Sequence, residues 1–168
     1  MKIYVASSWR NEHQPAVVIG LRNDGHEIYD FRHPAPGNDG FQWSAIDPEW
    51  QSWSPDKYFE ALRHPIAEQG YKYDMDAMLW ADICVLVMPC GRSAHLELGW
   101  FAGRGKLSCI LYDPLDPIEP ELMLKMCDAQ FSTLNFLKQW LNAGPDPQVA
   151  GHALDTKGEN DVFSTTET

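Results

Sequence analysis

The sequence predicts an α/β protein with a doubly wound, open, mostly parallel five-stranded sheet and helices on both faces. Two observations predict this class. Apolar runs rich in β-formers alternate with amphipathic helical patterns along residues 1–142. The run Asp82–Met88 (DICVLVM) is apolar from Ile83 onward, which is typical of a central parallel strand buried on both faces. The length of 168 residues fits one domain.

The first part of the chain predicts a strand, a helix and a second strand. Lys2–Ala6 (KIYVA) is rich in β-formers and ends in two serines. Gln14–Asn23 carries apolar residues at helical spacing, and Gly25 ends this pattern. His26–Phe31 (HEIYDF) is the next strand-like run. These runs supply two strands and one helix of the expected sheet.

Arg32–Ser54 follows neither periodicity. It contains prolines, glycines and three of the seven tryptophans, at Trp43, Trp50 and Trp53. So long an irregular segment inside a compact domain is typical of a functional loop or a lid. Its tryptophans either stack against a base or pack the loop itself.

The middle of the chain predicts two helices before the buried strand. Ser54-Pro55 opens the first, with serine as the N-cap and proline at the first position. This helix runs through Leu62 and extends to Ile66. A second helix is expected over Asp74–Ala81, directly before Asp82–Met88.

The remaining patterns complete the alternation. They predict a helix over Ser93–Gly103, a strand over Leu107–Tyr112, a short helix near Glu119–Met126, a strand near Ala129–Ser132 and a helix over Thr133–Asn142. Residues 143–168 are poor in core residues and rich in Gly, Pro and Thr. We therefore expect a domain over residues 1–142 and a disordered tail after it.

Composition limits the partners of the protein. The net charge of −11 and the pI near 4.8 are the opposite of a basic nucleic-acid surface. No apolar run is long enough to cross a bilayer. The four cysteines form no C-x-x-C pair, and Cys84 and Cys109 fall inside apolar runs. We expect a cytoplasmic protein that binds a small molecule, with neither nucleic acid nor membrane as a partner.

Ligands of open α/β sheets bind beyond the carboxyl ends of the strands, where the strand order reverses. In a flavodoxin-like order this point lies between the first and third strands. Ser7, Ser8, Trp9 and Arg10 follow the first strand, and a small polar turn follows the third. These four residues are therefore candidates for substrate binding.

The turn after the third strand opens a helix at Gly91, Arg92 and Ser93. Free backbone N–H groups at a helix N-terminus favour an anion, and the Arg92 guanidinium adds a charge-assisted contact. The alternative is that Ser93 only caps the helix and Arg92 faces water. The chain contains no dinucleotide-binding, P-loop or nucleophile-elbow motif.

Glu97 lies four residues after Ser93, on the same side of the helix. A capping box would place the acid at Leu96, so Glu97 is not explained in that way. Alone, it is explained as a surface acid that compensates the helix dipole. Asp74 supplies a second carboxylate near the same end of the sheet. Two carboxylates that flank one bond suit cleavage at an acetal-like carbon.

His95 is a candidate base, and a satisfied or solvent-facing histidine is the alternative. The other histidines show no ligand spacing. We therefore expect neither a metal nor a cofactor.

Three segments resemble the nucleoside 2-deoxyribosyltransferase family, including its nucleotide N-hydrolase branch. The first is Ile3–Trp9 (IYVASSW), and the second is Asp74 placed eight residues before Asp82. The third is Glu97-Leu98-Gly99, followed by Gly105-Lys106. The match extends over roughly residues 1 to 142.

The resemblance implies a Rossmann-like fold in which Glu97 attacks the anomeric carbon of a nucleoside or nucleoside 5′-monophosphate. A second base or water then replaces the leaving base. Asp74 handles protons or holds the sugar, Tyr4 orients Glu97, and Trp9 walls the base. The resemblance also implies a homo-oligomer whose subunits complete each other's sites.

Six residues before the nucleophile, transferases of this family resemble one another in an aspartate and the nucleotide hydrolases in a serine. Gly91 stands there in this chain, and Ser93 lies two residues later. Transfer and hydrolysis, and nucleoside and nucleotide, therefore stay open. Two other functions also stay open: a nucleotide-sensing module without chemistry, and an interaction protein that docks through its tryptophan loop.

Overall fold

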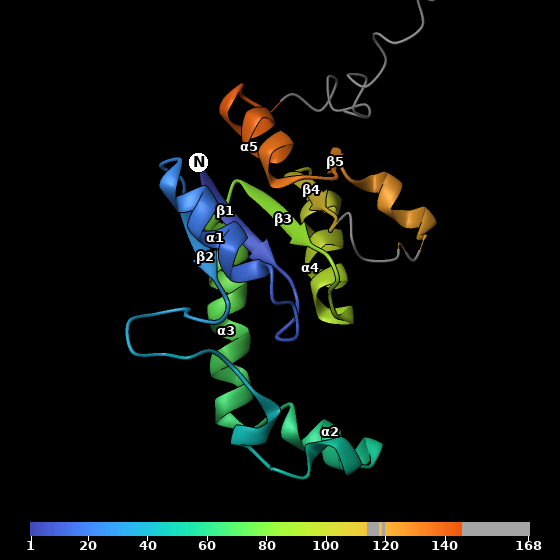
Figure 1. Cartoon of the computed structure of the whole chain (residues 1–168). Helices are drawn as coiled ribbons and strands as arrows, with labels where there is room; N and C mark the ends of the chain where they lie inside the picture. Colours follow the sequence, from blue (N-terminus) through green and yellow to red (C-terminus); the bar gives the residue numbers. More distant parts are fainter. Residues whose placement is uncertain (114–117, 119, 146–168) are drawn as a thin grey trace, which may run out of the picture.

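A computed structural model of the chain describes residues 1–113, 118 and 120–145. Its centre is a sheet with the strand order β2-β1-β3-β4-β5, which reverses between β1 and β3 (Figure 1). All four strand pairs are parallel, so the sheet is entirely parallel in the described part of the chain. The strands are β1 (Lys2–Ala6), β2 (Glu27–Asp30), β3 (Ile83–Val87), β4 (Leu107–Leu111) and β5 (Ala129–Phe131).

Helices cover both faces of the sheet, which confirms the doubly wound α/β fold. The helices α1 (Gln14–Asn23) and α5 (Leu134–Asn142) pack on one face, over Ile3, Val5 and their neighbours. The helices α3 (Pro65–Trp80) and α4 (Arg92–Gly103) pack on the other. In the described ranges no helix has the length and hydropathy needed to cross a membrane.

The strand register decides which side chains lie under α3 and α4. Side chains alternate between the two faces of a strand, so Tyr4 and Ala6 of β1 face α3 and α4. Tyr4 pairs with Tyr29 of β2 on one side and with Cys84 of β3 on the other. Cys84 is fully buried, as the sequence predicts. Tyr4 thus lies beside the point where the strand order reverses.

The predicted start of the helix before β3 is wrong. The helix α3 begins at Pro65, nine residues before Asp74, and α2 (Pro55–Ala61) ends well before Ile66. Proline restricts the residue before it to extended backbone, and His64 has ψ 138°. The His64 ring accepts a hydrogen bond from the Ile66 N–H at 3.2 Å and so caps the new helix. Asp74 therefore lies in the second half of α3 rather than at its start.

The other boundary differences are small. The helix α4 begins at Arg92 with Gly91 as its N-cap, one residue earlier than predicted. In place of the predicted short helix near residues 119–126, the structure has a 3₁₀ turn, η3 (Leu122–Met126), and residue 119 lies outside the described residues. The predicted disordered tail lies, from residue 146 on, outside the described residues.

The tryptophan-rich segment packs on itself. It contains two 3₁₀ turns, η1 (Trp43–Ala45) and η2 (Trp50–Ser52). Trp43 meets Phe41, Trp53 and Tyr58 edge to face, with ring centroids 4.7, 5.6 and 5.7 Å away. Together with α2, this segment lies beyond the carboxyl edge of the sheet, around the first turns of α3 (Figure 1). Trp43 and Trp53 therefore pack the loop, which is one of the two alternatives from the sequence.

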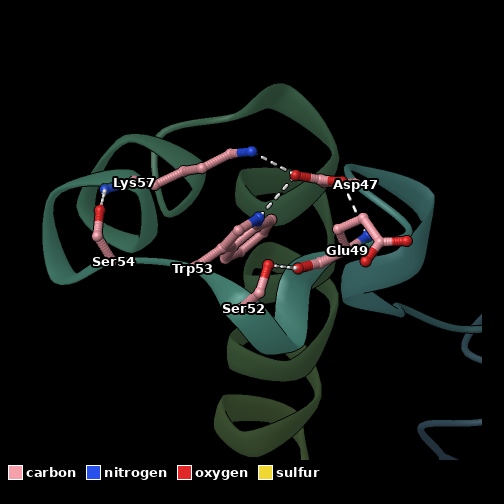
Figure 2. A network of polar contacts seen from close by, with 6 residues as sticks. All are labelled: Asp47, Glu49, Ser52, Trp53, Ser54 and Lys57. Carbon is pink, nitrogen blue, oxygen red and sulfur yellow. Dashed lines mark hydrogen bonds and ion pairs between the residues drawn. The ribbon is translucent and has the colours of Figure 1, made fainter.

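A network of polar contacts fixes the same segment to α2. Asp47 accepts hydrogen bonds from the Trp53 indole at 2.7 Å and from the Lys57 ammonium at 2.6 Å (Figure 2). These bonds hold the pKa of Asp47 at about 2. Ser54 caps α2 by accepting from the Lys57 N–H at 3.3 Å. The segment is thus an ordered lobe of the protein.

Candidate functional site

The candidate site lies where the loops after β1 and β3 meet. The Ser7 hydroxyl donates to the Val87 carbonyl at 2.8 Å, and the Asn11 amide donates to the Pro89 carbonyl at 3.0 Å. The bonded residues lie 80 and 78 residues apart in the sequence, so these bonds join two distant loops. The Ser7 hydroxyl therefore has a structural role, which is to join the loop after β1 to the end of β3. Sequence reasoning missed Asn11, whose partners are distant in the chain.

Glu97 lies on α4, close enough to Tyr4 for the Tyr4 hydroxyl to act on its carboxyl group. Burial and the nearby charge of Asp74 raise the pKa of Glu97 to about 7, and the Tyr4 hydroxyl opposes this rise. Burial, followed by the charges of Glu97 and Asp74, raises the pKa of Tyr4 well above its usual range. Tyr4 therefore stays a neutral hydrogen-bond donor, and Glu97 is half protonated near neutral pH.

Asp74 reaches the same place from α3. It accepts a hydrogen bond from the Tyr29 hydroxyl at 2.8 Å. Burial raises the pKa of Asp74, and the Tyr29 bond opposes this rise. Tyr29 was missed by sequence reasoning. The signal was its register in the second strand, one strand away from Tyr4 in a parallel sheet.

Two parallel tyrosine rings form the floor of the site. The rings of Tyr4 and Tyr29 stack with centroids 5.2 Å apart and an interplanar angle of 18°. Phe101 of α4 packs against Tyr4 with a centroid distance of 5.8 Å. Tyr29 donates to Asp74 and Tyr4 influences Glu97, so both carboxyl groups lie beside this pair of rings.

The remaining candidates after β1 have different surroundings. The Ser8 hydroxyl accepts from the Arg10 N–H at 3.2 Å, while the Arg10 side chain is exposed. Trp9 is 40% exposed and packs against Phe31 and Arg32. Sequence reasoning missed Arg32, because its hydrogen-bond partners are distant in the chain. Ser8, for example, lies 24 residues away. Of this group, Trp9 presents an exposed aromatic ring.

The turn before α4 is open to solvent. Gly91, Arg92 and Ser93 are exposed, and no side chain caps the N-terminus of α4. Ser93 therefore does not cap the helix, contrary to the alternative from the sequence. The first N–H groups of this twelve-residue helix are left for water or a ligand.

His95 makes local contacts. One ring nitrogen lies 3.2 Å from the Gly91 carbonyl oxygen and 3.4 Å from the Cys90 sulfur. It is a satisfied histidine, the simpler of its two interpretations. Among the described residues, no group of three His, Cys, Asp or Glu side chains is arranged to hold a metal ion.

An open hollow of about 320 Å³ lies between β2 and α3. It is lined by Ile28, Tyr29, Pro34, Tyr73, Asp76, Ala77 and Trp80. It shares Tyr29 with the candidate site but is lined by neither Glu97 nor Asp74. The paired carboxyl groups, rather than this hollow, define the site.

The structure is similar to that of the 2-deoxyribosyltransferase from the psychrotolerant bacterium Bacillus psychrosaccharolyticus. The two chains share 23% identity over 82% of this chain and 90% of that chain, with a TM-score of 0.51. The CMP N-glycosidase of Clostridium botulinum shares 15% identity over 85% of this chain and 98% of that chain, with a TM-score of 0.46. No protein-family profile matches the sequence, and no curated protein matches it significantly.

At 23% identity, the likeness to the 2-deoxyribosyltransferase shows the fold. The likeness extends over 90% of the length of that enzyme. The activity has to be argued from the two carboxyl groups and their surroundings.

Proposed function

We propose that this protein is an enzyme that cleaves or exchanges the N-glycosidic bond of a (deoxy)nucleoside or nucleoside 5′-monophosphate. The observation that carries the proposal is the pair Glu97 and Asp74, two partly buried carboxyl groups with raised pKa values beside two stacked tyrosines, one of which donates to Asp74. Paired acids with perturbed pKa values at a topological switch point are typical of catalysis.

In the proposed reaction, a carboxylate oxygen of Glu97 forms a bond to the anomeric carbon of the sugar. The bond from that carbon to the base nitrogen breaks, and its electron pair leaves with the base. Asp74 handles the proton that the base gains. A second base, or water that gives up a proton, then attacks the same carbon and releases the Glu97 carboxylate.

The proposal gives the other residues the following roles. Tyr4 orients the Glu97 carboxylate, on which its hydroxyl acts. Ser8, Trp9 and Arg10 bind the substrate from the loop after β1, with Trp9 as the wall for the base. Gly91, Arg92 and Ser93 present the N-terminus of α4 to an anionic group of the substrate.

A product assay tests the proposal. The protein is incubated with deoxynucleosides, ribonucleosides and their 5′-monophosphates, with and without a second free base, and the products are separated by chromatography. A new nucleoside identifies a transferase, and free base without exchange identifies a hydrolase. Release of no base from any substrate, at rates above the uncatalysed reaction, contradicts the proposal.

A nucleotide-sensing module of the same fold is the second candidate. The open N-terminus of α4 favours it, since anion binding there needs no catalytic carboxyl group. The two candidates differ at Glu97. In an enzyme, Glu97→Gln abolishes base release but keeps ligand affinity within about tenfold. A sensor binds a nucleotide, releases no base and is unaffected by the same substitution.

We further propose that the protein is a cytoplasmic homo-oligomer. Apolar side chains on α2 and the start of α3 are exposed, among them Tyr58 (42%), Phe59 (53%), Leu62 (43%) and Ile66 (41%). Four free thiols fit a reducing compartment. Sedimentation velocity of wild type and of Phe59→Ser/Leu62→Ser tests the assembly. A wild type that is monomeric at micromolar concentration contradicts it.

A further inference from the structure

Residues from the loop after β2 fix the Trp9 side chain in place. The Phe31 ring meets the Trp9 indole edge to face with centroids 5.3 Å apart. The Arg32 guanidinium lies over the same indole, 5.5 Å from its centroid. At Gly40, an added Cβ would lie 2.8 Å from Cζ2 of Trp9. Three residues of one segment, 22 to 31 residues away in the sequence, thus lie against one exposed indole.

Arg32 also fixes the backbone that carries Trp9. Its Nη2 lies 3.1 Å from the Ser8 carbonyl oxygen, 3.1 Å from that of Trp9 and 2.7 Å from that of Asn11. No carboxylate forms an ion pair with Arg32 in the part of the chain that the structure describes. The guanidinium is therefore committed to the loop, and its planar donor group suits several carbonyls at once.

Gly40 is required at its position for two reasons. Its φ of +78° is rare for residues with a side chain. An added Cβ would also lie 2.4 Å from the Phe31 carbonyl oxygen. Gly37 has almost the same backbone conformation, with φ +74°, but an added Cβ there meets nothing within 4 Å. The two glycines thus differ in contact rather than in backbone strain.

The loop that carries Trp9 is the same loop that Ser7 and Asn11 join to the β3–α4 turn. A shift of Trp9 therefore changes the wall of the crevice opposite α4. We propose that Arg32 and Gly40 are positioning residues that set the orientation of Trp9 and thereby the recognition of the base. This inference rests on the proposed function, because it assigns the base to the Trp9 side of that site.

Two variants test the inference, Arg32→Ala and Gly40→Ala, each with a matched control. Gly37→Ala introduces the same side chain at nearly the same φ without the contact. Arg104→Ala removes a guanidinium that lies 4.8 Å from the centroid of another indole, that of Trp100, at the far end of α4. Thermal unfolding of all four variants identifies any that fail to fold.

The first readout needs no activity. Protein labelled with 5-fluorotryptophan gives one ¹⁹F signal per tryptophan, and the Trp9→Phe variant assigns the signal of Trp9. We expect Arg32→Ala and Gly40→Ala to shift or broaden this signal and to leave the other six within the spread of the controls. An unchanged Trp9 signal in both variants overturns the inference, whatever the enzyme does.

The second readout uses a substrate found in the product assay. We expect each variant to raise KM by about tenfold or more and to change kcat much less, since base recognition is weakened while Glu97 is untouched. Guanidinium ion at tens of millimolar should restore part of the affinity of Arg32→Ala and none of that of Gly40→Ala. Loss of kcat at constant KM, or kinetics equal to those of the controls, overturns the inference.

Discussion

The rings of Tyr4 and Tyr29 stack on neighbouring strands with centroids 5.2 Å apart; Tyr29 donates to Asp74, and Tyr4 lies near Glu97. The stack is a consequence of the parallel register, which pairs these two residues. It brings Asp74 of α3 and Glu97 of α4 together, although the helices are separated by β3 in the sequence. The geometry of the site is therefore set by the sheet.

The Tyr29 hydroxyl bonds only one of the two carboxyl groups, Asp74, so its removal tests Asp74 separately from Glu97. Tyr29→Phe keeps the stacked ring but removes the bond to Asp74, which lowers the pKa of Asp74 in the wild type. We expect kcat to fall by about tenfold to a hundredfold, because Asp74 loses the bond that orients it for proton transfer to the base. Steady-state kinetics across pH check this.

Tyr112→Phe is the matched control, since it removes a hydroxyl that donates to Gln130 at 3.0 Å near the other edge of the sheet. An equal loss in both variants would mean that the Tyr29 bond has no special role in the reaction.

The pH dependence of the reaction reports Glu97. A nucleophilic carboxylate has to be ionised, and the pKa of Glu97 is about 7. We expect kcat/KM to rise with pH to a midpoint near that value, and a fall at higher pH reports the group that protonates the base. In Asp74→Asn the rising limb should move to lower pH, because the charge of Asp74 contributes to the raised pKa. A rate that is constant between about pH 5 and 8 is the opposite outcome.

The ionised carboxylate of Glu97 should also reduce the stability of the folded protein at neutral and higher pH. Its pKa is raised from 4.5 in the unfolded chain to about 7 in the folded one. Its carboxyl group thus contributes stability below about pH 4.5 that is lost as the pH rises through 7. We expect Glu97→Gln to match the wild type near the lower pH and to exceed it at pH 8 by about 3 kcal/mol. Urea unfolding across pH checks this, and a variant less stable at pH 8 contradicts it.

Lys106 holds the end of the helix that carries Asp74. Its ammonium donates to the carbonyls of Met78, Leu79 and Ala81 at 2.9, 2.8 and 2.6 Å. Lys106→Met should therefore lower the free energy of unfolding by about 1 to 3 kcal/mol, because these carbonyls lose their charged partner. Lys125→Met, at an exposed position in η3, is the control and should change it by less than about 0.5 kcal/mol. Equal urea midpoints for the two variants would refute the role.

Much of the fold follows from local patterns. The apolar run of β3 and the strand–helix alternation predict an α/β sheet, since burial on both faces leaves no polar alternation. The start of α3 was missed for a local reason as well: residues 65–73 have exposed apolar side chains, such as Ile66 and Tyr71, that blur the helical period. From the sequence, the Gly105-Lys106 pair is only part of the family resemblance. In the structure, the three carbonyl contacts of Lys106 give a physical reason for a lysine at this position.

The candidate site also contains residues that local patterns predict and residues that they do not. Tyr4 lies within a predicted strand, and Asp74 and Glu97 lie in helices directly before and after another, so local patterns bring the three residues together. Arg32 and Gly40 carry no such signal, because their contacts with the Trp9 loop depend on the path of an irregular segment. Loop paths are set by tertiary contacts, which local propensity does not encode.

The most direct measurement of the central claim is the mass of the protein after rapid acid quenching with a substrate identified in the product assay. We predict an added mass equal to the sugar residue, and peptide mapping should place it on Glu97. The adduct should be absent from Glu97→Gln. Base release by the wild type with no adduct on Glu97, or base release by Glu97→Gln at the wild-type rate, would contradict the assignment of Glu97 as the nucleophile.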